Sequence, residues 1–179
     1  MRRRVAALGT GAALLLSGCT TPDGPKEEKP TMNMQQAAER ADEILDKTFA
    51  AIKPPVNWTH GETSKGSCDV SRRRQVMTII SAERRGSLFG VVERHWKEQG
   101  YRHLSSNNSK IPATYFETQD GFRVRLLVGL QGHASFEVAT PCVDPSDVAP
   151  PKSKTVGPDY SGEFPLPLPD VHSDFWSAS

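Results

Sequence analysis

The chain has 179 residues, enough for one domain with its own hydrophobic core, and 36% of them are hydrophobic and 7% aromatic. Both fractions are low for a protein that folds along its whole length, so they indicate unstructured flanks around a smaller folded unit. The 22 Lys or Arg and 21 Asp or Glu nearly balance, and total charge therefore selects no class of partner.

The N-terminus has the features of a secretory signal peptide. Residues 2–4 are arginines, and residues 5–16 form an apolar run shorter than the roughly 20 residues that span a bilayer. The run ends in Leu16-Ser17-Gly18-Cys19, which resembles the lipobox of bacterial lipoproteins: Leu, a small residue, Gly or Ala, and then Cys. All four positions match.

This resemblance implies that Cys19 carries lipid. In lipobox proteins diacylglycerol is attached to the cysteine sulfur, the signal peptide (here residues 1–18) is removed, and the cysteine becomes an N-terminus that bears acyl chains such as palmitate. Two or more acyl chains bury enough methylene groups, at roughly 0.8 kcal/mol each, for stable anchoring. We expect a lipid-anchored protein on the extracytoplasmic face of the cell membrane. A plain signal peptide with an incidental cysteine is the alternative.

The mature chain divides into three parts by composition. Residues 19–30 are polar and proline-containing, which predicts a tether. Residues 31–142 hold 15 Lys or Arg against 12 Asp or Glu and are expected to form the folded domain. Residues 143–179 hold seven of the 14 prolines and two Lys against six Asp or Glu, so a basic domain is followed by a Pro-rich acidic tail.

The domain begins with an amphipathic helix in the prediction. Asn33 caps it, Gln36 completes a capping box, apolar residues recur at helical spacing up to Ile52, and Pro54-Pro55 ends it. We expect this helix to pack on a sheet, since its alanine-rich apolar face and mixed charges do not suit a membrane surface. A short strand over residues 56–60 and a stronger, β-branched strand over 75–80 follow.

A second helix and four strands complete the predicted domain. Ser87 caps the helix and Gly100 closes it. Strands are expected over residues 101–104, 114–118, 122–130 and 134–138, with Asp120-Gly121 as a hairpin turn. Short connections favour antiparallel pairing. The fold class is therefore α+β: a mainly antiparallel sheet of five to six strands with two helices on one face, and Arg123 and Arg125 on the other.

Cys68 and Cys142 remain as an even pair once Cys19 is assigned to lipid. In an oxidising compartment such a pair predicts a disulfide, which would close a loop of about 75 residues and contribute on the order of 4 kcal/mol. Neither cysteine has a Cys or His neighbour at metal-ligand spacing, and a Cys-x-x-Cys motif is absent. A structural bridge is favoured over a zinc or redox site.

The predicted domain also loosely resembles small uncharacterised lipoproteins of high-GC Gram-positive bacteria. The matching pieces are the segments Trp96-Lys97-Glu98-Gln99-Gly100-Tyr101, Asp120-Gly121-Phe122 and Thr140-Pro141-Cys142. This resemblance implies no activity and identifies no catalytic residue.

The sequence contains no recognisable catalytic or metal-binding motif. The five histidines are scattered, no Gly-x-Ser-x-Gly nucleophile motif occurs, and there is no glycine-rich phosphate loop. We therefore expect no catalytic residues, metal or cofactor, and no nucleic-acid partner. A predicted folded unit of about 112 residues is also too small to form the two lobes of a solute-binding lipoprotein easily.

Two basic clusters suggest an anion site. Arg72, Arg73 and Arg74 precede the predicted strand at 75–80, and Arg84 and Arg85 follow it. Their ligand would be a phospholipid headgroup or an anionic cell-wall polymer, and membrane tethering would raise the local concentration. A merely solvated surface is the alternative.

The last residues of the tail have the composition of a docking motif. Phe164, Leu166 and Leu168 alternate with prolines, and Phe175-Trp176 adds two aromatics. Proline lowers the entropy lost on binding a groove. We expect the tail to be dispensable for folding, and we favour a groove on its own domain over one on an envelope protein, because an intramolecular partner is always present.

Taken in order, these features predict a lipid-anchored cell-envelope lipoprotein that acts as a non-catalytic binding or adaptor module. The alternative is a small envelope enzyme with an unrecognised site. A deep pocket with convergent polar groups would favour the enzyme, and a flat or grooved surface would favour the adaptor.

Overall fold

A computed structural model describes residues 32–160, 162–163 and 165–179. The predicted signal peptide, the lipobox with Cys19, and the tether lie outside the described residues. The described elements, in chain order, are α1 (Met34–Ala51), β1 (Trp58–His60), β2 (Ser64–Lys65), β3 (Val70–Val76), α2 (Arg85–Glu98), β4 (Arg102–Asn107), β5 (Ala113–Glu117), β6 (Arg123–Val128), a 3-10 turn (Leu130–Gly132) and β7 (Ala134–Ala139).

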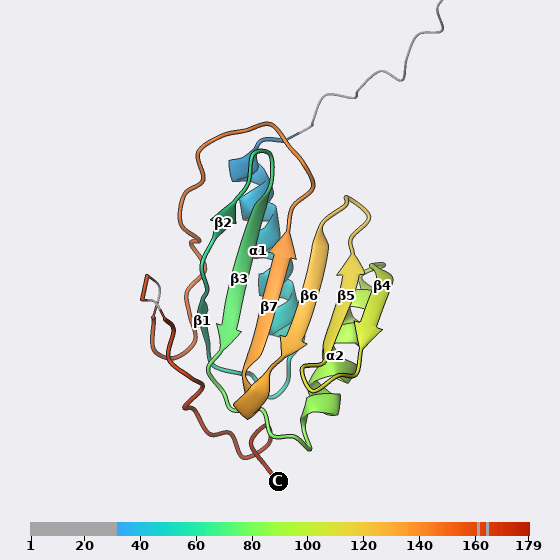
Figure 1. Ribbon diagram of the computed structural model, residues 1–179, viewed down its shortest axis with the longest axis vertical. Coiled ribbons are helices and arrows are strands. Elements are labelled where there is room, and N and C mark those ends of the chain that lie inside the picture. The colour runs from blue at the N-terminus through green and yellow to red at the C-terminus, as the bar shows by residue number, and fades with distance from the viewer. Residues whose placement is uncertain (1–31, 161, 164) are drawn as a thin grey trace, which may run out of the picture.

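The strands form one antiparallel sheet with the order β1-β3-β7-β6-β5-β4, and the short β2 also pairs with β3. Both helices lie on one face of this sheet, and Figure 1 views the molecule from the other face. Buried and half-buried residues alternate along β3 and β7, as expected for strands covered on one side only. The predicted fold class is confirmed.

The capping box of α1 is confirmed. The Asn33 side chain accepts a hydrogen bond from the Gln36 backbone at 3.0 Å, and the Gln36 side chain accepts one from the Asn33 backbone at 2.9 Å. Small buried residues such as Ala37, Ala38 and Ala41 let the helix lie close to the sheet.

Ser87 was the wrong cap for α2. The helix begins at Arg85, and Ser87 lies inside it. The cap residue is Arg84, which makes no side-chain capping hydrogen bond, and its own backbone N–H donates to the Ser81 hydroxyl at 3.3 Å in the preceding turn. Gly100 follows the helix with a φ of 76°, the left-handed geometry expected of a residue that closes a helix.

The strand predicted at residues 75–80 is displaced. The structure has β3 at Val70–Val76, so the three consecutive arginines lie inside the strand. Val70 and Val76 are six positions apart, an even spacing that places both on the core face of the strand, and Arg72 and Arg74 therefore face inward as well. The β-branched segment after β3 pairs instead with the C-terminal residues, through a parallel bridge between Thr78 and Val171.

The chain after Cys142 is not a separate segment. Figure 1 shows it passing over one end of the sheet, along β1, and then across the opposite end. Val143 and Trp176 belong to the hydrophobic core, and the Trp176 indole donates to the Pro54 carbonyl at 2.7 Å. This packing argues against the expectation that the tail is dispensable for folding, and it agrees with docking on the chain's own domain.

Cys68 and Cys142 form the predicted disulfide. It joins the chain just before β3 to the chain just after β7, and the Val143 backbone donates to the Cys68 carbonyl at 2.7 Å. In the part of the chain that the structure describes, no helix has the length and apolar character needed to cross a membrane.

Candidate functional site

The main cleft lies between the β1–β2–β3 region and the C-terminal chain. It has a volume of about 960 Å³, and residues 60–63, 65 and 72 form one wall. Residues 148–155, with Asp159 and Gly162, form the other wall. We call residues 144–160 the strap, because they cross the α1 side of the sheet and then follow β1.

The strap is fastened along its length by backbone contacts. Val156 and Trp58 exchange backbone hydrogen bonds of 2.9 and 3.3 Å, which places the strap against the edge of β1. The Tyr160 N–H donates to the Thr59 hydroxyl at 3.0 Å, and the Ala149 N–H donates to the Gln35 side chain at 2.7 Å. These hydrogen bonds fix the position of this cleft wall, although it has no regular secondary structure.

Arg72 joins three parts of the molecule at the base of the cleft. Its side chain is buried, its Nη1 donates to the Thr63 hydroxyl at 2.7 Å, and its Nη2 donates to the Ala149 carbonyl at 2.6 Å. Its Nε lies 3.2 Å from the Asp42 carboxylate, an ion pair without the alignment of a hydrogen bond. The guanidinium therefore connects α1, the β1–β2 loop and the strap.

Arg74, two residues further along β3, makes a similar set of contacts. Its Nη2 donates to Asp46 at 2.6 Å, and its guanidinium lies 4.0 Å from the centre of the Trp58 ring. Asp46 also accepts a hydrogen bond from the Ser153 hydroxyl of the strap at 3.0 Å. His60 contributes a further contact, with Nε2 at 2.8 Å from the Ser153 carbonyl oxygen.

Burial dominates the electrostatics of these groups. It raises the pKa of Asp42 despite the opposing charges of Arg72 and Arg74. It also lowers the pKa of both arginines despite the opposing pull of their carboxylate partners. Ion pairs of this kind add little net stability, but the loss of one partner is costly because it leaves a buried charge without its counterion.

The open part of the cleft carries an excess of positive charge. Four cationic residues line it, Lys65, Arg72, Lys152 and Lys154, against two acids, Glu62 and Asp159. Both lysines of the acidic tail are thus placed at this cleft.

The lysines are only weakly compensated. Lys65 lies 3.9 Å from Asp147 and Lys152 lies 3.5 Å from Glu39, both at exposed positions where ion pairs contribute little. Lys154 has no ion pair with any residue that the structure describes. An anionic group that enters the cleft would therefore meet three lysines with at most weak, exposed ion pairs, together with the two acids of the lining, Glu62 and Asp159.

Comparisons with known proteins identify no function for the chain. No protein-family model matches the chain, and no curated protein matches it. Among solved structures, the chain is similar to a DUF4853 family protein from Actinomyces odontolyticus, with 10% identity over 78% of this chain and 75% of that chain, and a TM-score of 0.32.

The arginines predicted as one anion site do not lie on one surface. Arg72 and Arg74 are buried with carboxylates, whereas Arg73 projects from the opposite face of β3 and donates to Glu137 at 2.8 Å. Arg84 lies over the Phe175 ring, 4.4 Å from its centre, and Arg85 begins α2. The prediction treated the run as one exposed patch, but a strand directs alternate residues to opposite faces. Of the five arginines, Arg72 lines the cleft.

The predicted docking residues of the tail also separate. Trp176 is fully buried in the chain's own core, Leu166 is half-buried, and Leu168 is 60% exposed. Phe175 is 37% exposed and packs edge-on against Trp176. Phe164 lies outside the described residues. The roles of Lys154 at the cleft and of Val156 at the β1 edge were not predicted from the sequence. The two lysines in an otherwise acidic tail could have indicated the cleft.

The cleft combines positively charged groups with apolar side chains. Across the described residues no group of three or more His, Cys, Asp or Glu could hold a metal ion. His60, the imidazole at the cleft, contacts a backbone carbonyl oxygen rather than a hydroxyl or thiol nucleophile. What the cleft offers is a set of cations beside the apolar side chains of Val148, Pro150 and Pro151.

Proposed function

We propose that the protein is a lipid-anchored, non-catalytic binding module of the cell envelope, and that it holds an anionic ligand in the cleft beside the strap. The observation that carries this proposal is the placement of both tail lysines in a cleft that Lys65 and Arg72 also line. The apolar residues of the strap would contact the uncharged part of the same ligand.

Cross-linking in intact cells tests the binding site. A photoreactive benzoylphenylalanine at Thr155, which lines the cleft, should yield a cross-linked species. The same group at exposed Lys110 should not. Lys65→Gln with Lys154→Gln should abolish the cleft cross-link, whereas Lys53→Gln with Lys97→Gln, an equal change of charge at exposed sites, should preserve it. Equal yields in both double variants would contradict the proposal.

The anchor is tested separately. Cys19→Ala should abolish the incorporation of labelled fatty acid and move the protein from the membrane fraction to the soluble fraction, because no acyl chain remains to be buried. Undiminished membrane retention of that variant would show that something other than lipid on Cys19 holds the protein.

A small envelope enzyme is the second candidate, and one contact favours it. On β4, His103 Nε2 lies 2.8 Å from the Ser106 hydroxyl, which lies 2.9 Å from the Thr114 hydroxyl. A register shift between His103 and Ser105 places the two side chains together. A base beside a serine is one element of nucleophilic catalysis. Labelling of Ser106 by a fluorophosphonate, with loss of labelling in His103→Ala, would support the enzyme, and an unlabelled protein would reject it.

A further inference from the structure

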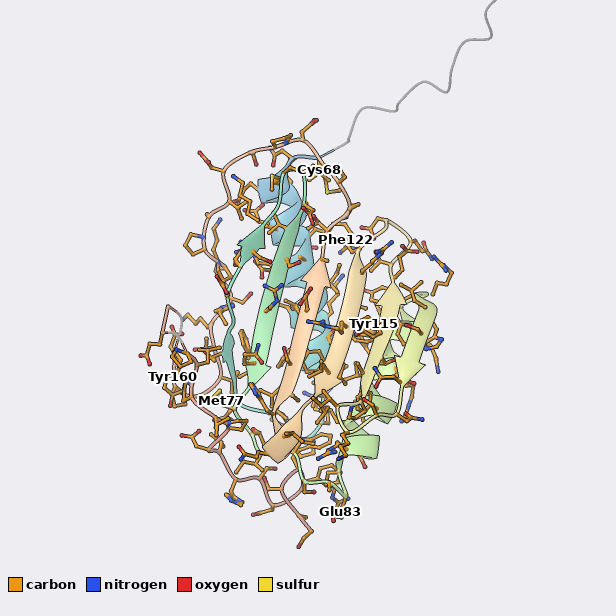
Figure 2. All side chains as sticks on the ribbon, in the orientation of Figure 1. Cys68, Met77, Glu83, Tyr115, Phe122 and Tyr160 are labelled. Carbon is orange, nitrogen blue, oxygen red and sulfur yellow. A yellow bond between two sulfur atoms is a disulfide. The ribbon has the colours of Figure 1, made fainter. Side chains whose placement is uncertain are left out.

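The face of the sheet opposite the helices carries a second cluster of charge, separate from the cleft. Adjacent strands present side chains to this open face from paired positions, so the pairing register places them in rows. One row runs Arg73, Glu137, Arg125, Tyr115 across four neighbouring strands. The next row contains Arg123, Glu117 and Arg102. Figure 2 shows Tyr115 on β5, the strand next to the β4 edge.

Each glutamate on this face is shared by two arginines. Glu137 accepts from Arg73 at 2.8 Å and from Arg125 at 2.6 Å. Glu117 contacts Arg102 and lies 3.9 Å from Arg123. Each group of three therefore keeps one uncompensated positive charge.

The arginines are also the outer members of these groups. The Glu137 and Glu117 side chains are 18% and 22% exposed, whereas those of Arg102 and Arg123 are 70% and 74% exposed. A ligand that approaches the face meets guanidinium groups before it meets carboxylates. Guanidinium groups bind phosphate and carboxylate oxygens through paired N–H donors, which makes an anionic ligand the natural complement.

The spacing of the charges indicates an extended ligand. Neighbouring strands lie about 4.8 Å apart, and successive outward residues of one strand lie about 7 Å apart, so the four arginines are distributed over a broad area. A small anion could contact only one group of three. A chain with repeated charges could contact both groups at once.

A polymer fits this face better than a membrane surface does. Proteins that bind a bilayer surface combine cations with apolar side chains that enter the lipid. The large apolar side chains exposed among the described residues come from β4, loops and the tail, and none comes from β3, β5, β6 or β7. We propose that the open face binds a linear polyanion with repeated phosphate groups, and that Arg102 and Arg123 are its main contacts.

Binding of inorganic polyphosphate to the full chain with Cys19→Ala tests this proposal, because the substitution removes the acyl anchor that would insert into vesicles. Long-chain polyphosphate should bind more tightly than orthophosphate, and the affinity should fall as salt is added. Arg102→Gln with Arg123→Gln should weaken polyphosphate binding on the order of tenfold. The matched control is Arg94→Gln with Lys110→Gln, which removes two charges from exposed positions elsewhere and should change the affinity less than twofold.

Three results would overturn the proposal. They are equal weakening in the two double variants, binding of polyphosphate no tighter than orthophosphate, and binding to phosphatidylglycerol vesicles without binding to polyphosphate. Unchanged circular dichroism in both variants excludes a folding defect. The cleft residues Lys65 and Lys154 are intact in all of these proteins, so this test and the cross-linking test can fail independently.

Discussion

The two edge strands of the sheet differ: β1 is covered by another part of the chain, and β4 is exposed. At the β1 edge, the strap pairs with Trp58 through Val156, and all three residues of β1 are buried. At the β4 edge no further strand pairs among the residues that the structure describes, and all six residues of β4 are exposed. An unpaired edge can recruit other strands, and proteins limit this with charges and irregular pairing. Here β4 has the exposed Arg102 and a register shift, whereas β1 is covered by the chain itself.

The comparison teaches that the tail is part of the domain. The strap and the C-terminal residues supply hydrogen bonds, a core tryptophan and one wall of the cleft. The β4 edge depends on local pairing alone. Substitutions at the covered edge should therefore alter both the free energy of unfolding and the cleft. Substitutions at the open edge should alter neither.

Trp176→Ala tests this difference most strongly. We expect the free energy of unfolding to fall by about 3–5 kcal/mol, because a fully buried indole and its hydrogen bond to Pro54 are lost. Phe175→Ala is the control at the adjacent, partly exposed position and should cost about 1 kcal/mol. Urea denaturation followed by circular dichroism measures both. Truncation after Asp144 should lower Tm at least as far as Trp176→Ala does. An unchanged Tm would mean that the tail is dispensable.

Val156→Pro should cost at least about 1 kcal/mol, because the strap loses the N–H that donates to the Trp58 carbonyl. Val156→Ala keeps this donor and is the matched control. Light scattering should also show concentration-dependent association of the proline variant alone, since the β1 edge is then less well covered. Equal stability and equal association of the two variants would show that the strap does not protect the β1 edge.

The difference in stability between the wild type and Asp42→Asn should depend on pH. Burial raises the pKa of Asp42, so the folded protein holds that proton more tightly than the unfolded chain does. This carboxyl therefore contributes stability at pH values below its ordinary pKa of 3.8, and the contribution is lost as the pH rises through the raised pKa. The stability of the wild type relative to Asp42→Asn should decline across that interval. A difference that rises with pH would show that the pair with Arg72 outweighs burial.

Leu104→Ala, at the open edge, should produce the smallest change. Leu104 lies beside the register shift of β4 and is 37% exposed, so its truncation should alter the free energy of unfolding by no more than about 0.5 kcal/mol. The same urea titration measures it. A loss approaching that of Trp176→Ala would show that the β4 edge also contributes to the core.

Local signals in the sequence sufficed for most of the fold. The capping box at Asn33, the glycine after α2 and the spacing of Cys68 and Cys142 each depend on nearby chemistry or on simple pairing, and each was predicted correctly. The arginine run was harder, because charged residues ordinarily face solvent. Its position depends on the valines at either end of β3, which face the core, and on Asp42 and Asp46 on a distant helix.

The cleft could not be predicted for a related reason. Its second wall is the strap, which has no hydrophobic periodicity and is positioned by contacts with residues about 100 positions away, such as Val156 with Trp58. Proline-rich composition is typical both of disordered tails and of extended segments that pack on a surface. Composition alone favoured a disordered tail. The buried Trp176 shows instead that the tail packs on the domain.

The disulfide also determines how the domain carries a mechanical load. The Met32 carbonyl accepts a hydrogen bond from Asp144, and Val143 donates to Cys68, so the first described residue lies beside the covalent link between β3 and β7. Figure 2 shows Cys68 at the end of the molecule where α1 begins in Figure 1. With the proposed lipid on Cys19, tension from a bound partner would enter the domain at this cross-linked end. The adjacent strands β3 and β7 joined there cannot separate at that end while the bridge is intact, so the load would reach the sheet along its strands rather than by peeling an edge.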